Sequence, residues 1–131
     1  MKTLVTGGTG LVGSAIQAEI KLGSKDMDLR NWVDVDKIFA KYQPTNVIHC
    51  AARVGGLGDN INHKGEFYYD NIMINTNTLE ACRKYNIKKA VSFLSTCIFP
   101  DNVEYPLTED KIHLGEPHSS NYAYAYAKRM L

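Results

Sequence analysis

The sequence is poor in cysteine and has no excess of charge of either sign. Its 131 residues include three cysteines, Cys50, Cys82 and Cys97, an odd number without the spacing of a metal-ligand set. Lysine and arginine together number 15 and aspartate and glutamate 14, so there is no electrostatic case for binding nucleic acid or an anionic membrane. Cysteines without a pairing pattern favour a reduced, cytoplasmic setting.

Long apolar runs are also absent. No stretch is long enough to span a bilayer, and Met1 and Lys2 lead directly into a short apolar segment rather than a signal peptide. Hydrophobic residues at 44% and charged residues at 22% are ordinary for one globular domain of this length. The chain stops at Leu131 inside a helical pattern, without a capping glycine or a closing strand, so we expect the front portion of a longer protein.

A glycine-rich loop near the start carries the first functional signal. The segment KTLVTGGTGLVGSAI begins with an apolar strand over 3–5 and enters a helix near Leu11, with Gly7, Gly10 and Gly13 three residues apart. The first glycine permits a tight turn, the second lets the backbone approach a pyrophosphate, and the third lets the helix lie close to the strand. A glycine turn that binds nothing is the alternative, but the flanking strand and helix favour a dinucleotide.

Strand and helix patterns alternate along the rest of the chain. In chain order these are a helix over 33–42, a buried strand over 44–52, a long helix over 66–85 and a strand over 89–97. The alternation predicts an α/β fold, a Rossmann-type doubly wound parallel sheet that stops before its last strands and a substrate domain. Ligands of such sheets collect at the carboxyl ends of the strands, here residues 7–13, 51–57 and 95–97.

Tyr124 and Lys128 form a candidate acid–base pair. Four residues apart on a helix they share one face, where the ammonium group would favour the tyrosinate and lower the pKa of the phenol. Ser95, at a predicted strand end, would orient a substrate carbonyl. A chance pairing is the competing interpretation, and Tyr122 and Tyr126 flank the pair, but neither stands four residues before a lysine.

The stretch LSTCIFP raises a separate question about Cys97. If the strand continues through it, Ser95 and Cys97 point to the same side, because side chains alternate along a strand. A small buried hydrophobe is the usual fate of a free cysteine and is the competing interpretation. Cys50, in a predicted strand, and Cys82, in a predicted helix, are structural by default.

These motifs carry a family resemblance. TGGTGLVGSAI, Y-x-x-x-K and the strand-end serine resemble the extended short-chain dehydrogenase/reductases, and PTNVIHCAARVGGL, LSTCIFP, YPLTED and YAYAKRM resemble the GDP-L-fucose synthases among them. The resemblance covers nearly the whole chain. It implies NADPH-dependent conversion of GDP-4-keto-6-deoxy-D-mannose to GDP-L-fucose by 3,5-epimerisation and 4-reduction. Another nucleotide-sugar epimerase or reductase of the superfamily, and a non-catalytic dinucleotide sensor, stay open as alternatives.

The resemblance also implies roles for four residues. Ser95 matches the substrate-orienting serine and Cys97 the base of epimerisation. Tyr124 matches the proton donor in reduction, and Lys128 the lysine that positions the nicotinamide ribose and lowers the pKa of the tyrosine. The acid of epimerisation is a histidine beyond Leu131, so the 131-residue chain alone is expected to be inactive. A GDP-sugar substrate and a homodimer are implied in the same way.

NADP(H) is the expected cofactor. The residues expected to contact it are Gly7, Gly8, Thr9, Gly10, Leu11, Val12, Gly13, Ser24, Lys25, Asp28, Leu29, Ala51, Ala52 and Lys128. Ser24 and Lys25 follow the second strand and suit a 2′-phosphate, although Asp26 beside them is the residue type that holds the ribose of NAD.

Several positions in this set keep a second interpretation. Asp28 and Leu29 match an element that lines the adenine, but Lys25 and Asp28 fit solvated surface charges nearly as well. Arg53 would either meet a phosphate or lie in solvent as a loop charge. The region between Leu11 and Ser24 is too short for a helix, a turn and a full strand, so either the second strand is very short, around residues 20–22, or residues are missing from the chain.

Overall fold

The computed structural model describes residues 1–131, which form two compact units. The first unit consists of Met1–Ala52 and Met73–Phe93, and the second of Arg53–Ile72 and Leu94–Leu131. The first unit contains the sheet. The second contains the turn and the helix that carry the predicted catalytic residues.

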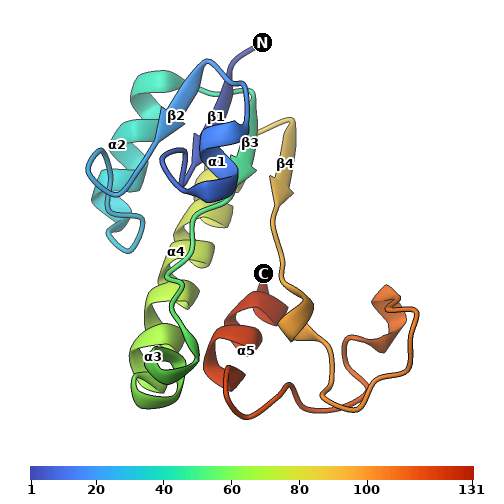
Figure 1. Ribbon diagram of the computed structural model, residues 1–131. Helices are drawn as coiled ribbons and strands as arrows, with labels where there is room; N and C mark the ends of the chain where they lie inside the picture. Colours follow the sequence, from blue (N-terminus) through green and yellow to red (C-terminus); the bar gives the residue numbers. More distant parts are fainter. The chain divides into compact units, whose positions relative to one another are not determined.

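The sheet of the first unit has four parallel strands in the order β2-β1-β3-β4 (Figure 1). The strands are β1 Thr3–Thr6, β2 Ile20–Leu22, β3 Asn46–His49 and β4 Lys89–Ser92. Leu4 of β1 stands opposite Ile20 on one side and Val47 on the other, and Val47 stands opposite Ala90. Parallel pairing with helical connections confirms the predicted Rossmann-type α/β fold.

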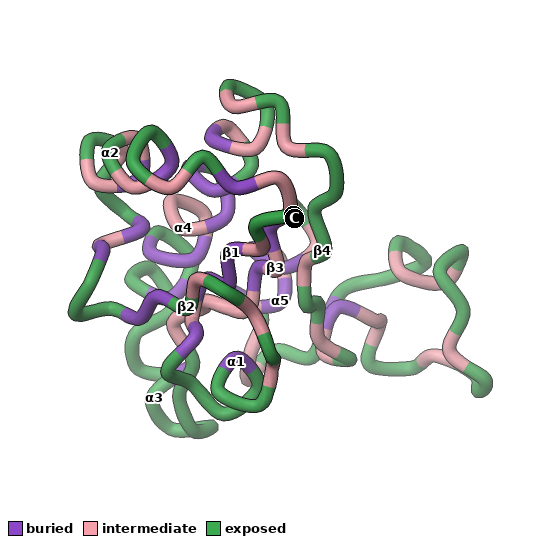
Figure 2. The backbone as a smooth tube through the Cα atoms, turned by 90° about the horizontal axis from the view of Figure 1, so that it is seen from above, coloured by how far each residue is buried: buried purple, intermediate pink, exposed green.

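Helices lie on both faces of this sheet (Figures 1 and 2). The short α1, Leu11–Ala15, lies on one face, and α2, Trp32–Tyr42, lies on the other. The Asn31 side chain starts α2 by accepting a hydrogen bond from the Val33 N–H at 2.9 Å, as an N-cap residue does. Gln43 ends α2 in the left-handed region, at φ 44°.

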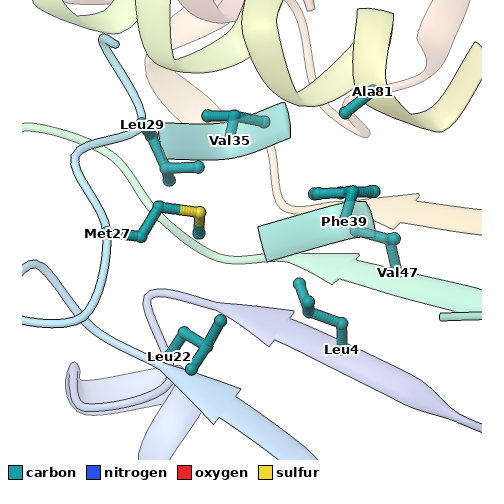
Figure 3. Close-up of a cluster of buried hydrophobic side chains, with 8 residues drawn as sticks. All are labelled: Leu4, Leu22, Met27, Leu29, Val35, Phe39, Val47 and Ala81. Atoms are coloured by element: carbon teal, nitrogen blue, oxygen red, sulfur yellow. The ribbon is translucent and has the colours of Figure 1, made fainter. Parts of the chain in front are cut away.

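The core of the first unit lies between the sheet and α2 (Figure 3). Leu4 and Val47 point from the strands toward Val35 and Phe39, which are four residues apart on one face of α2. The remaining buried members of the cluster are Leu22, Met27, Leu29 and Ala81. Full burial of such an aliphatic or aromatic side chain contributes about 1.5–3 kcal/mol, so this cluster is a main source of the unit's stability.

The long helix α4, Lys64–Lys84, uses buried asparagines to hold neighbouring loops. Asn71 in the second unit accepts a hydrogen bond from the Arg53 N–H at 2.9 Å and donates to the Arg53 carbonyl at 3.0 Å. In the first unit, Asn77 donates to the Leu29 carbonyl at 2.9 Å. These bonds satisfy backbone groups of irregular segments, which would otherwise be buried at a cost.

Several predicted boundaries need correction. The strand predicted over 89–97 ends at Ser92 as β4, and a 3₁₀ turn, η1, follows at Thr96–Ile98. Residues Leu57–Asn62 form a helix, α3, that the sequence analysis did not predict. Of the two alternatives left open for the second strand, the structure shows a short strand, Ile20–Leu22, and α1 before it has only five residues.

The second unit contains no strand. Besides α3, η1 and the N-terminal part of α4, it holds a 3₁₀ turn, η2, at Glu109–Lys111 and the helix α5 at Tyr122–Met130. The helix α5 packs against η1. No helix of the chain combines the length and the apolar character that crossing a bilayer requires.

Candidate functional site

The glycine loop of the first unit has the backbone geometry of a ligand-approach loop. Gly7, directly after β1, has φ +69°, a conformation that favours glycine, and a Cβ there would lie 2.8 Å from the Ala51 nitrogen. A Cβ on Gly13 would overlap the Gly7 carbonyl oxygen. The structure therefore brings Gly7, Gly13 and Ala51 together, as expected, and explains why the first and last of these glycines have no side chain.

The rest of the loop leaves the start of α1 open. The Gly8 N–H donates to the Leu22 carbonyl at 2.8 Å, and the Gly10 N–H donates to the Gly7 carbonyl at 3.0 Å. Gly10 stands at the N-cap and has no side chain, so the first turn of α1 receives no capping hydrogen bond from its N-cap residue. Leu11 is 94% exposed and Thr9 and Val12 are also exposed, which leaves this edge of the loop accessible to a ligand.

A buried polar network supports this loop. His49 is 1% exposed at the end of β3, and its Nε2–H donates to the Asn75 side-chain oxygen at 3.1 Å. Its Nδ1 accepts from the Thr6 hydroxyl at 2.7 Å, one residue before Gly7. His49 is therefore a core residue, and the sequence carried no signal for its partners.

The residues predicted around the adenosine half lie after β2. Ser24 and Lys25 are exposed in a turn in which the Gly23 N–H donates to the Asp26 carboxylate at 2.8 Å. Asp28 is paired with Arg30 at 3.0 Å, and hydrogen bonds from Arg30 hold the pKa of the Asp28 carboxyl below its ordinary value.

Two of the predicted cofactor contacts are less exposed. Leu29 is only 8% exposed and packs in the core cluster, so a ligand could reach little of its side chain. Ala51 and Ala52 follow β3 and are half-buried.

Arg53 has two carboxylate partners within the second unit. Its guanidinium donates to Asp70 at 2.8 Å and to Glu66 at 3.0 Å and lies 4.8 Å from the centroid of the Phe67 ring. Hydrogen bonds from Asp70 and then Glu66 raise the pKa of Arg53 above its ordinary value. Arg53 is therefore a partly exposed residue that is ion-paired with two carboxylates, rather than an isolated loop charge.

Ser95 and Cys97 lie together in the second unit, but not on a strand. Ser95 caps η1, and its hydroxyl accepts a hydrogen bond from the Cys97 N–H at 3.4 Å. Both side chains are half-buried, and Ile98 after them is 3% exposed. The two residues are therefore brought together by a capped 3₁₀ turn rather than by strand alternation.

Tyr124 and Lys128 occupy one face of α5, as their spacing predicted. The Lys128 ammonium lies 5.9 Å from the centroid of the Tyr124 ring, and Lys128 is buried. Because α5 packs against η1, this pair shares the second unit's interior with Ser95 and Cys97.

The pKa of Tyr124 shifts in the direction opposite to the one expected from the sequence. Burial raises the pKa of Tyr124, and the nearby Cys97 raises it further, whereas we expected Lys128 to lower it. Burial also raises the pKa of Cys97, while the Ser95 hydroxyl and the charges of Lys128 and Arg129 act in the opposite direction. For Cys82, which has only burial acting on it, the pKa rises to about 11.

Arg129 was not selected from the sequence, although it adjoins Lys128. Its Nε–H donates to the Ile98 carbonyl at 2.6 Å, and a terminal N–H donates to the Gly115 carbonyl at 2.8 Å. An arginine directly after the lysine of Y-x-x-x-K was the available signal, but a surface charge fitted it equally well.

A protein-family model for the NAD dependent epimerase/dehydratase family matches residues 3–131. The chain belongs to this family. The glycine loop fits a dinucleotide: three of its glycines, Gly7, Gly8 and Gly13, stand where a Cβ would overlap neighbouring backbone, and the first turn of α1 has no side-chain cap.

Similar members of the family are GDP-L-fucose synthases. A probable GDP-L-fucose synthase of Drosophila melanogaster is 49% identical over 141 positions, which cover 99% of this chain and 44% of that protein. The GDP-L-fucose synthase of Dictyostelium discoideum is 50% identical over 139 positions, covering 98% and 43%. The crystal structure of a GDP-L-fucose synthetase from Naegleria fowleri bound to NADP has a TM-score of 0.88 at 54% identity, covering 98% and 44%. The expected resemblance is confirmed.

The lengths of these alignments carry two further facts. This chain spans less than half the length of each of these relatives. The alignments of 141 and 139 positions are longer than the 131 residues of the chain, so both curated relatives carry residues without a counterpart here.

Proposed function

We propose that this chain, as one domain over residues 1–131, is the cofactor-binding part of a GDP-L-fucose synthase. The proposed reaction converts GDP-4-keto-6-deoxy-D-mannose to GDP-L-fucose. The observation that carries the proposal is the presence of Ser95, Cys97, Tyr124 and Lys128 on two packed elements, η1 and α5, in a chain about half identical to such enzymes. A non-catalytic dinucleotide sensor would have no need of this combination.

NADP(H) is the proposed cofactor, with the glycine loop, Gly7 to Gly13, receiving its pyrophosphate. Exposed Ser24 and Lys25 after β2 suit the 2′-phosphate, and the relative from Naegleria fowleri is described as bound to NADP. The residues proposed to contact the rest of the NADP molecule are Asp28, Leu29, Ala51, Ala52 and Lys128. When bound, this cofactor supplies the hydride of the reduction.

In the proposed reduction, Ser95 and Tyr124 act on the C4 ketone. The Ser95 hydroxyl donates a hydrogen bond to the ketone oxygen, and the Tyr124 phenol gives its proton to that oxygen as the alcohol forms. The raised pKa of Tyr124 keeps the phenol protonated and ready to donate. Lys128, buried beside the tyrosine ring, keeps a positive charge near the resulting tyrosinate.

In the proposed epimerisation, Cys97 is the base. The C4 ketone acidifies the protons on C3 and C5, and the thiolate removes them to leave an enolate. The acid that returns a proton to the opposite face lies outside this chain. Burial is the larger effect and keeps the pKa of Cys97 above its ordinary value, and the charges of Lys128 and Arg129 act in the opposite direction and favour the thiolate.

A homodimer and a cytoplasmic location complete the proposal. Tyr68 and Tyr69 on α4 and Tyr122 and Met130 on α5 are exposed, and such apolar side chains on two helices suit a helical interface. None of the three cysteines forms a disulfide, consistent with a reducing compartment.

The activity is tested with the full-length protein. Purified enzyme mixed with GDP-4-keto-6-deoxymannose and NADPH should lose the NADPH absorbance and form GDP-L-fucose. Ser95→Ala should lower this rate by about 10²-fold or more, because it removes a donor aimed at the developing alkoxide. The matched control is Ser92→Ala at the end of β4. Full turnover by Ser95→Ala, or formation of a different sugar, would contradict the proposal.

A further inference from the structure

The Arg129 guanidinium joins three segments of the second unit. It extends from α5, donates to the Ile98 carbonyl at 2.6 Å and to the Gly115 carbonyl at 2.8 Å, and lies 5.2 Å from the centroid of the Tyr126 ring. Ile98 belongs to the turn η1 and directly follows Cys97. Arg129 is therefore a direct polar link between the helix that carries Tyr124 and Lys128 and the turn that carries Cys97.

This link depends on the shape and charge of arginine. The guanidinium is planar and rigid, so it reaches two carbonyls in fixed directions while one face stacks on an aromatic ring. A lysine keeps the charge but places one compact donor group at the end of a flexible stem. Both acceptors are neutral carbonyls, so they do not offset the positive charge of the guanidinium. That charge lies close enough to the Cys97 thiol to oppose the rise that burial causes in its pKa.

We propose that Arg129 is a positioning residue that holds the Thr96–Ile98 turn against α5 and thereby keeps Cys97 in place for epimerisation. The inference rests on the proposed function, because it assumes that Cys97 is the base. Tyr124 and Lys128 belong to α5 itself and keep their places without Arg129. Cys97 lies on the separate turn, so the loss of Arg129 affects epimerisation more than reduction.

The first test measures the turn itself and needs no activity. In η1 the Ile98 N–H donates to the Ser95 carbonyl and the Phe99 N–H to the Thr96 carbonyl, both at 3.2 Å. In the 131-residue chain, Arg129→Leu and Arg129→Lys should both speed amide hydrogen exchange at Ile98 and Phe99 by about tenfold or more, since both lose the rigid guanidinium that bonds the Ile98 and Gly115 carbonyls together. Arg83→Leu, which removes an exposed arginine on α4, is the matched control and should leave these amides unchanged.

The second test separates the two chemical steps in the full-length protein. Arg129→Leu and Arg129→Lys should lower deuterium uptake from solvent at C3 and C5 by about tenfold or more, and reduction of an already epimerised ketone by clearly less. The lysine variant keeps the positive charge near Cys97. A loss of epimerisation in this variant therefore reports a change in the placement of Cys97 rather than the loss of a charge. Unchanged exchange at Ile98 and Phe99, or equal losses in both steps, would overturn the inference. If the unmodified enzyme performs neither step, the proposed function fails, and the exchange measurement still decides whether Arg129 holds the turn.

Discussion

The Lys128 ammonium lies 5.9 Å from the centroid of the Tyr124 ring, and Lys128 itself is only 2% exposed. A lysine is rarely buried without a partner that favours its charge, and an aromatic face is one such partner. The pair is fixed by the four-residue spacing on α5 and by the packing of that helix on η1. This arrangement places the lysine beside a phenol whose pKa burial has raised.

The tyrosine hydroxyl should therefore matter for reduction and little for folding. Tyr124→Phe keeps the ring under the Lys128 ammonium but removes the proton, and should lower reduction by about 10²–10⁴-fold, as expected for loss of a general acid. The rate of reduction is measured by following NADPH consumption with an already epimerised ketone as the substrate. Tyr126→Phe, two residues along α5, is the control and should react normally. Similar rates for the two variants would remove Tyr124 from the proposed role.

The cysteines should differ in reactivity in a predictable order. Burial raises the pKa of Cys82 to about 11, so near pH 8 very little of it is thiolate, and its alkylation should rise about tenfold per pH unit up to that value. The pKa of Cys97 is also raised, but Ser95, Lys128 and Arg129 oppose the shift, so Cys97 should form more thiolate than Cys82 at the same pH.

Mass spectrometry of peptides after brief treatment with iodoacetamide measures both cysteines in one sample. Cys97 should be modified first between pH 7 and about 9, the range in which an ordinary thiol begins to ionise. Faster modification of Cys82 would show that the charges around Cys97 do not act on its thiol.

The glycine loop gives a matched pair of substitutions. A Cβ on Gly13 would overlap the Gly7 carbonyl, whereas a Cβ on Gly58 in α3 would meet nothing within 4 Å. Gly13→Ala should destabilise the chain by about 1–3 kcal/mol, the typical cost of overpacking, and weaken binding of NADP. Gly58→Ala should be neutral or slightly stabilising, because alanine restricts the unfolded chain. Urea unfolding and calorimetric titration with NADP are the measurements, and normal NADP affinity in Gly13→Ala would argue against the loop as its site.

Arg53 should matter for stability and not for the cofactor. Arg53→Ala removes ion pairs with Asp70, whose side chain is 11% exposed, and with Glu66. Its thermal unfolding midpoint should fall below that of Arg83→Ala, which breaks only an exposed pair with Glu80. NADP affinity should stay the same in both variants. A selective loss of NADP affinity in Arg53→Ala would support the interpretation of Arg53 as a phosphate ligand.

The sequence predicted the elements whose signals are local. The periodicity of α2 and α4 and the glycines around β1 each reflect one element or one turn, and these predictions agree with the structure. The prediction of a strand over 89–97 was wrong at its end, because apolar residues continue past Ser92, where β4 ends. The 3₁₀ turn that follows is marked by the capping hydrogen bond from the Cys97 N–H to the Ser95 hydroxyl.

Interactions between distant residues were not predictable in this way. Arg53 with Asp70, His49 with Asn75, and Arg129 with Ile98 are separated by 17, 26 and 31 residues along the chain. Each partner is an ordinary polar residue in the sequence, and only the tertiary fold selects it. The direction of the Tyr124 pKa shift was missed for the same reason, because the tertiary fold buries the phenol and places Cys97 near it, and both raise its pKa.

The most direct measurement is the reaction of full-length Cys97→Ser with two ketones. With GDP-4-keto-6-deoxymannose as substrate, we expect the formation of GDP-L-fucose to be lost, because the base is gone. With the already epimerised ketone, we expect NADPH consumption at close to the unmodified rate, because Ser95, Tyr124 and Lys128 are intact. Equal loss of activity on both ketones would contradict a site in which one thiol and one phenol serve separate steps.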